Sequence, residues 1–196
     1  MWISGTGEDH QKKDRTVRTL ESIVRSVYKA LKVTEDYMAY EYEYIGRYLP
    51  ENITFVTTQE LEDMYPDCTP KEREYKIAKL HGAVFIEQIG DKMKSGEKHD
   101  GRAPDYDDWK LNGDILVYYP VLDIGLELSS MGIRVDEDSL KEQLVKAGCE
   151  ERAELPFQKA VLEESFRIQS AAVSVSPVSV CSPAESTYRR GAGVDL

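Results

Sequence analysis

The stretch that decides the fold reads HDGRAPDYDDWKLNGDILVYYPVLDIGLELSSMGIRVD, from His99 to Asp136. Its first part, His99 to Trp109, gathers four aspartates, a histidine and an arginine. A merely solvated turn seldom holds so many charges, so we expect some of them to be ligands. Asn112-Gly113 predicts a tight turn into a strand from Asp114 to Tyr119. A second strand is expected from Gly125 to Asp136, and the short connection makes the pair antiparallel.

Two carboxylates interrupt the apolar pattern of these strands. Asp114 begins the first strand, while Glu127 lies between Leu126 and Leu128, which must point to the other face. A carboxylate in an apolar strand is costly to bury unless it is paired or holds a cation. Two of them across one hairpin suit Mg²⁺ carrying nucleotide phosphates, and Arg134 offers a planar fork for a carboxylate or phosphate. A surface hairpin with ordinary alternation explains the same spacing, so both interpretations stay open.

The residues before this stretch predict flanking helices and strands. Apolar residues recur at helical spacing from Asp14 to about Tyr44, which predicts a long amphipathic helix that Val33-Thr34 could interrupt. The helix carries tyrosines near its end, and we expect them to pack on a sheet. Capping boxes and apolar runs predict two shorter helices and two strands: Thr57 to before Pro66, Thr69 to His81, Ile53 to Val56 and Ala83 to Ile89.

Composition excludes several classes of protein. A chain of 196 residues with 41% hydrophobic content suffices for one domain. A formal net charge of -11 argues against non-specific nucleic-acid binding. The apolar runs are far shorter than a membrane span and no signal pattern begins the chain, so we expect a cytoplasmic protein with no membrane contact. The three cysteines form no CxxC pair, which indicates neither a disulfide framework nor a zinc site.

Three strings resemble, almost letter for letter, the ammonia-dependent asparagine synthetase family: RAPDYDDW at Arg102 to Trp109, LNGDILV at Leu111 to Val117 and ELSSMGIRVD at Glu127 to Asp136. Two preceding strings match the family more loosely: TQELEDMYPD at Thr58 to Asp67 and AKLHGAVFIEQIGDK at Ala78 to Lys92. The resemblance extends from about Asp14 to Glu164. One departure is that only Lys110 separates DDW from LNGD, where the family often has an insertion.

The resemblance implies an α+β fold like the catalytic core of class II aminoacyl-tRNA synthetases, an antiparallel β-sheet flanked by helices, here incomplete. It also implies the reaction. ATP activates the β-carboxylate of L-aspartate as an aspartyl adenylate with release of pyrophosphate, and ammonia then attacks to give L-asparagine and AMP. ATP is therefore expected as a substrate and Mg²⁺ as the cofactor, because a phosphate-bridging metal would neutralise the charge built up as pyrophosphate leaves.

The family match also assigns site residues. Asp114 and Glu127 are the candidates to bind the metal and the ATP phosphates. Asp107 would face the substrate amino group or the attacking ammonia, with Ser130 lining the pocket. Arg134 is a further candidate for binding ATP or its phosphates. Asp108 is a further candidate residue of the site.

The ends of the chain depart from the family. The resemblance predicts three parts: an out-of-frame or disordered segment 1–13, a partial catalytic domain 14–164 and a frameshifted, disordered tail 165–196. Plausible codons read in another frame turn Met1 to Gly7 into the family string YVDQWDW, and Arg167 to Ser182 into a string containing GGGIGQSR. Sequencing the locus tests this idea, which fails if the DNA cannot encode GGGIGQSR.

Such ends would remove the first-motif region that forms the family's homodimer and the arginines that grip ATP. The chain is therefore expected to have little or no synthetase activity. Two other interpretations remain. The chain could be a fragment of an aspartyl- or asparaginyl-tRNA synthetase, or a catalytically inactive module that binds aspartate, a nucleotide or a partner.

Overall fold

The computed structural model describes residues 15–163 and 172–174. The expected segments 1–13 and 165–196 lie outside this part of the chain, except for three residues of the latter. The described elements follow one another in this order: α1 (Val17–Glu41), β1 (Thr54–Thr57), α2 (Thr58–Met64), α3 (Pro70–His81), β2 (Ala83–Glu87), β3 (Asp107–Tyr119), β4 (Ile124–Arg134), α4 (Glu137–Ala147), η1 (Glu150–Glu154), α5 (Pro156–Leu162) and β5 (Ala172–Ser174). No helix among the described residues is long and apolar enough to cross a membrane.

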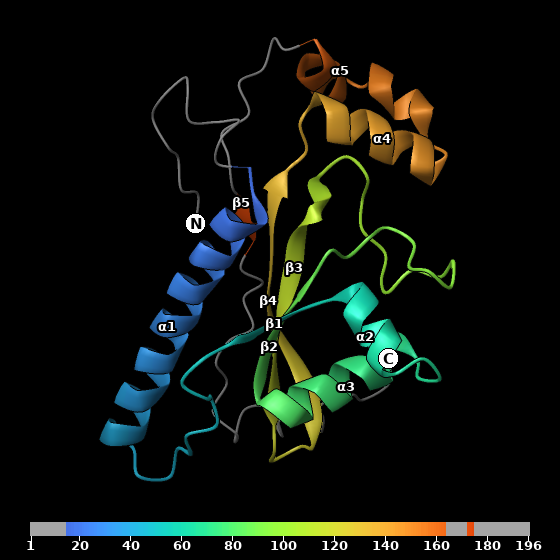
Figure 1. Ribbon diagram of the computed structural model, residues 1–196. Helices are drawn as coiled ribbons and strands as arrows, with labels where there is room; N and C mark the ends of the chain where they lie inside the picture. The colour runs from blue at the N-terminus through green and yellow to red at the C-terminus, as the bar shows by residue number, and fades with distance from the viewer. Residues whose placement is uncertain (1–14, 164–171, 175–196) are drawn as a thin grey trace, which may run out of the picture.

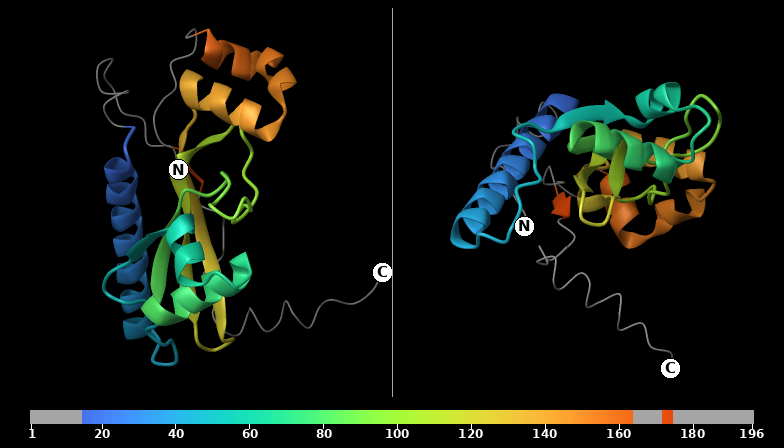
Figure 2. Two further views of the ribbon diagram at one scale, coloured as in Figure 1. Left: turned by 45° about the vertical axis from the view of Figure 1, so that its right-hand side comes forward. Right: turned by 90° about the horizontal axis from the view of Figure 1, so that it is seen from below.

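The strands form one sheet in the order β1-β2-β3-β4-β5. The pairs from β2 to β5 are antiparallel, and β1 pairs with β2 in the parallel direction. Helix α1 covers one face, α2 and α3 cover the other, and α4 and α5 lie beyond the end of β4 (Figures 1 and 2). This arrangement confirms the predicted α+β class, in which helices flank a mainly antiparallel sheet.

Alternation along the strands divides the core into two apolar layers. Ile115 and Val117 of β3 pack in the same cluster as Leu20 and Val24 of α1. Leu116, between them in the sequence, belongs instead to the cluster on the other face. That second cluster includes one residue each from α2 and α3, Leu61 and Ile77. The two layers form because successive side chains point to opposite sides of a strand.

The predicted helix starts are confirmed. Thr57 with Glu60 and Thr69 with Glu72 both form complete capping boxes, in which each side chain bonds to the other residue's backbone N–H. Gly82 ends α3 with a φ of 78°, which a residue with a side chain rarely adopts.

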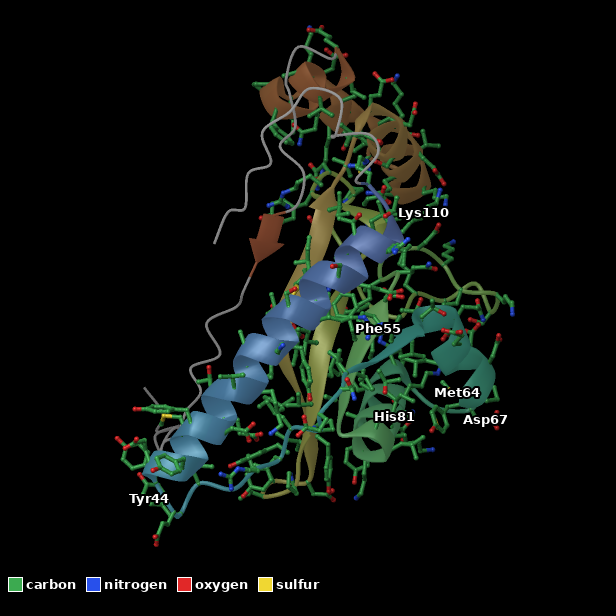
Figure 3. All side chains as sticks on the ribbon, turned by 60° about the vertical axis from the view of Figure 1, so that its left-hand side comes forward. Tyr44, Phe55, Met64, Asp67, His81 and Lys110 are labelled. Carbon is green, nitrogen blue, oxygen red and sulfur yellow. The ribbon has the colours of Figure 1, made fainter. Side chains whose placement is uncertain are left out.

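Helix α1 runs without interruption through residues 33 and 34. The prediction that its tyrosines pack on the sheet is wrong. Tyr37 and Tyr40 are 60% and 78% exposed, and Tyr44 lies at the far end of the helix (Figure 3). Helical geometry explains this, since positions 37 and 40 fall on the side of α1 opposite to the buried Leu20 and Val24.

The predicted turn at Asn112-Gly113 is also wrong, because both residues lie inside β3. The buried Asn112 side chain accepts a hydrogen bond from the N–H of Ile89 at 3.0 Å and donates to its carbonyl at 2.9 Å. A Cβ at Gly113 would lie 2.3 Å from the Ile86 carbonyl oxygen. The pair therefore serves close packing of β3 against β2, and the turn propensity of the dipeptide is overridden by tertiary contacts.

Replacing Gly113 with alanine is expected to lower the free energy of unfolding by about 2 kcal/mol, because the added methyl group meets backbone that must shift. Urea denaturation of both proteins measures the difference. The control is Gly96→Ala, where no atom lies within 4 Å of the added Cβ but φ is positive, so backbone strain alone contributes. A Gly113→Ala variant no less stable than Gly96→Ala would contradict the close approach.

Candidate active site

Pairing of β3 with β4 brings four of the predicted residues together. In the register of the two strands Asp114 faces Ser130, and Asp107 faces Arg134. Each acidic residue therefore sits beside a residue that can donate a hydrogen bond. The predicted antiparallel hairpin is confirmed, with β4 ending at Arg134 and not at Asp136, whose side chain caps α4 instead.

A β-bulge in β4 determines where Glu127 lies. Ile115 pairs with Ser129, but the next residue, Leu116, pairs with Glu127, which leaves Leu128 as the extra residue. In a regular strand Glu127 and Ser130, three positions apart, would point to opposite faces. The bulge instead puts both on the face covered by α3, while Leu126 and Leu128 pack against the α1 cluster, as the sequence predicts.

Asp114 is held by a residue to which the sequence assigned no role. Arg102, in the segment before β3, forms a salt bridge to Asp114 Oδ1 and donates to Ser130 Oγ at 2.7 Å. Asp114 is only 7% exposed. Burial raises the pKa of Asp114, and the Arg102 guanidinium opposes that rise. The three side chains form one hydrogen-bonded group, which we call the Arg102–Asp114–Ser130 triad.

Asp107 and Arg134 form a second charged pair at the ends of the same strands. Arg134 Nη1 donates to Asp107 Oδ1 at 2.9 Å, and the guanidinium lies 3.0 Å from the centroid of the Tyr106 ring. Burial raises the pKa of Asp107, while Arg134 and then Arg102 oppose the rise. Gly132 allows the close approach, since a Cβ there would lie 2.6 Å from Asp107 Cγ.

Helix α3 adds a third carboxylate near Asp114 and Glu127. Glu74 accepts a hydrogen bond from Lys71 Nζ at 2.8 Å and contacts His99 Nε2 at 3.2 Å. His99 is buried against this glutamate, so it supports α3 and does not touch the triad directly. Glu127 is exposed, and its pKa is raised first by loss of hydration and then by Asp114, with Glu74 contributing. No pattern in the sequence indicated Glu74, because only folding brings α3 to β4.

Asp108 is bound to residues other than those of the triad and the Asp107–Arg134 pair. Its Oδ2 accepts from Arg15 Nη2 at 2.9 Å, and its Oδ1 accepts from the backbone N–H of Lys110. Arg15 also pairs with Asp136 at 3.0 Å. Arg15, just before α1, therefore links Asp108 of β3 to Asp136, the N-cap of α4.

Whether a metal fits depends on Asp114 and Glu127. No group of three or more His, Cys, Asp or Glu residues in the described part of the chain could hold a metal ion. Asp114 and Glu127 nevertheless place two carboxylates on one face of the sheet, and each has a raised pKa. Magnesium commonly uses one or two protein carboxylates together with phosphate oxygens. The donor set therefore fits Mg²⁺ that arrives with a nucleotide.

A cavity of about 330 Å³ lies elsewhere, between β1, α2 and α3. Phe55, Met64 and His81 are among its lining residues (Figure 3). It contains none of the charged residues of the triad or of the Asp107–Arg134 pair. The charged residues of the candidate site thus lie on or beside the β3–β4 hairpin and not in this cavity.

Comparison with known proteins gives one family for most of the chain. The model of the aspartate-ammonia ligase family matches residues 8–170. Aspartate--ammonia ligase of Ruminiclostridium cellulolyticum is 61% identical over 155 residues, which are 79% of this chain and 46% of that protein. The Clostridium perfringens (strain SM101) enzyme of the same name is 60% identical over 152 residues, covering 78% and 45%.

Among solved structures, aspartyl-tRNA synthetase from Entamoeba histolytica is similar at 17% identity and a TM-score of 0.48, covering 88% of this chain and 37% of that one. The chain spans about half the length of the curated relatives it matches. The family model covers more than half of its residues. The chain belongs to the aspartate-ammonia ligase family.

Proposed function

We propose that this chain forms part of the site of an ATP-dependent ligase that makes L-asparagine from L-aspartate and ammonia. One observation carries the proposal: two arginine-bound aspartates, Asp114 and Asp107, lie on strand β3 of a chain in the aspartate-ammonia ligase family. Arginine side chains held in place in this way are preorganised positive charges, which stabilise the negative charge that develops when a carboxylate attacks a phosphate. The proposal includes an aspartyl-adenylate intermediate, with AMP and pyrophosphate as products.

Each site residue has a role in this proposal. Asp114 and Glu127 would hold Mg²⁺, which would neutralise the phosphates of ATP when it is bound. Arg134 presents a guanidinium fork suited to a phosphate or carboxylate group. Asp107, partly buried and held by Arg134, would accept hydrogen bonds from the substrate amino group or from ammonia. Ser130 would line the substrate side and hold Arg102 in place.

The cellular location, the metal and the assembly of the protein are also proposals. We propose a cytoplasmic protein that uses Mg²⁺, as expected where ATP, aspartate and ammonia meet. The relatives' length suggests that further elements complete the site. Groups that act on one transition state contribute as a unit, so a polypeptide that holds only some of them loses most of the rate. The same elements would form the family's homodimer.

The purified 196-residue chain, incubated with ATP, Mg²⁺, aspartate and ammonia, is expected to form AMP and asparagine at least 100-fold more slowly than the full-length R. cellulolyticum relative. Chromatography of both products measures the rates. Calorimetry with Mg-ATP on the same sample is expected to show binding that Asp114→Asn weakens. A rate equal to the relative's would contradict the predicted loss, and the same Mg-ATP affinity in Asp114→Asn would contradict the assigned site.

A further inference from the structure

Arg102 forms a salt bridge to Asp114, the carboxylate to which the proposed metal would bind. Its two terminal nitrogens are bound to Asp114 and to Ser130. Its third donor, Nε, is buried and has no hydrogen-bond partner among the described residues. A buried donor without a partner is unusual, because leaving one unpaired costs free energy. The Arg102 guanidinium therefore has fewer hydrogen-bond acceptors in the free site than it can bind.

We propose that Arg102 is a placeholder cation, which neutralises Asp114 in the free site and moves to the phosphate oxygens of ATP when Mg²⁺ takes Asp114. This inference rests on the proposed function and adds a residue to its ATP-binding machinery. The ligand of Arg102 in the loaded site is the triphosphate, whose oxygens accept bidentate hydrogen bonds from a planar guanidinium.

Arg102 and the proposed metal ion cannot both bind Asp114, because both are positively charged. A guanidinium in contact with the carboxylate and a divalent cation on the same carboxylate would repel each other strongly in a partly desolvated site. The metal therefore has to displace Arg102 to bind alone. When a nucleotide arrives with the metal, its phosphates offer new acceptors, and the displaced arginine keeps a partner.

The fold allows Arg102 to move and restrains the other arginine. Residues 101–106 precede β3 and belong to no helix or strand, so Arg102 can change position without breaking sheet hydrogen bonds. Its side chain is 23% exposed. Arg134, in contrast, is part of β4, is 10% exposed at its side chain, and is fixed between Asp107 and the Tyr106 ring. Only Arg102 is placed to exchange one anionic partner for another.

The inference predicts opposite effects of one substitution on two ligands. Arg102→Ala in the full 196-residue chain is expected to bind Mn²⁺ alone about tenfold more tightly than the wild type, because the competing cation is gone. The same variant is expected to bind Mg-ATP about tenfold more weakly, because a phosphate ligand is gone. Electron paramagnetic resonance of free Mn²⁺ measures the first affinity, and calorimetry measures the second.

Four further variants separate competition from other causes. Arg102→Lys keeps a cation without the fork, so it should bind Mn²⁺ like the wild type and Mg-ATP more weakly. Arg47→Ala removes the same charge at an exposed site beside Asp36 and should change neither affinity. Asp114→Asn should abolish Mn²⁺ binding, and adding Arg102→Ala to it should restore nothing. Circular dichroism checks that each variant is folded.

The outcomes distinguish the two proposals. If Asp114→Asn weakens Mn²⁺ binding but Arg102→Ala leaves it unchanged or weaker, the metal site stands and the placeholder role of Arg102 is rejected. If Arg102→Ala fails to fold, a wild-type Mg-ATP affinity in Arg102→Lys rejects the transfer to phosphate. If neither the wild type nor Arg102→Ala binds Mn²⁺, the assignment of Asp114 fails and the inference fails with it.

Discussion

Replacing Arg134 with alanine is expected to lower the free energy of unfolding by about 3–5 kcal/mol. The side chains of Arg134 and Asp107 are 10% and 12% exposed. Removing the arginine leaves a buried carboxylate without its charged partner and also removes the contact with the Tyr106 ring. Urea denaturation at pH 7 measures the change. The loss should shrink as the pH is lowered, because the pKa of Asp107, already raised by burial, rises further and the carboxyl becomes neutral.

A double-mutant cycle with Asp107→Asn isolates the pair. The double variant Asp107→Asn with Arg134→Ala should be more stable than Arg134→Ala alone, because the unpaired charge is gone. Lys110, labelled in Figure 3, provides the matched control. Lys110→Ala breaks an ion pair with Glu142 at 2.9 Å, but the two side chains are 64% and 42% exposed. That loss should stay within about 1 kcal/mol. Equal losses for Arg134→Ala and Lys110→Ala would show that burial does not strengthen the first pair.

Replacing Glu87 with glutamine is expected to stabilise the protein by up to about 3 kcal/mol at pH 8 and by little at pH 4.5. Glu87 ends β2 with 6% of its surface exposed, and its Oε1 has no hydrogen-bond partner among the described residues. Burial raises its pKa from 4.5 to about 7, Glu21 and Glu60 add to the rise, and Arg25 opposes it. The folded state therefore disfavours the charged form.

The direction of the pH effect follows from that raised pKa. Because the folded protein holds the Glu87 proton more tightly than the unfolded chain, its stabilising effect is complete below about pH 4.5 and is lost as the pH rises to about 7. Glutamine stays neutral throughout and avoids the loss. Urea denaturation between pH 4.5 and 8 measures the difference between variant and wild type. Glu97→Gln, at an exposed position, is the control, and a Glu87→Gln curve parallel to the wild-type curve would contradict the buried-carboxylate account.

Particular residues show how far the site could be predicted. The strings around Asp107, Asp114 and Ser130 identified the β3–β4 hairpin, and pairing of these strands brings the three residues together with Arg134. Glu127 lies on the same face of the sheet as Ser130 only because of the bulge at Leu128, which the sequence pattern does not reveal. A bulge changes the register by one residue without leaving a composition signal, so an alternation argument cannot locate it.

The turn at Asn112-Gly113 was predicted wrongly because local propensity competed with tertiary packing. Asn112-Gly113 has the composition of a hairpin turn, yet contacts with Ile86 and Ile89 keep it in a continuous strand. Asp108 stands beside Asp107 in the motif, yet successive strand residues point to opposite faces, and it bonds with Arg15.

The sequence by itself determined the α+β class, the helix caps, the antiparallel hairpin and membership of the aspartate-ammonia ligase family, because these follow from short-range periodicity and from contiguous strings. Only the tertiary structure decided that Arg102 binds Asp114, that Glu74 faces Glu127 from α3, and that Glu87 is buried without a full set of partners. The physical reason is that burial and charge pairing depend on which distant segments meet. No local pattern specifies the dielectric surroundings or the partners that a side chain acquires when the chain folds.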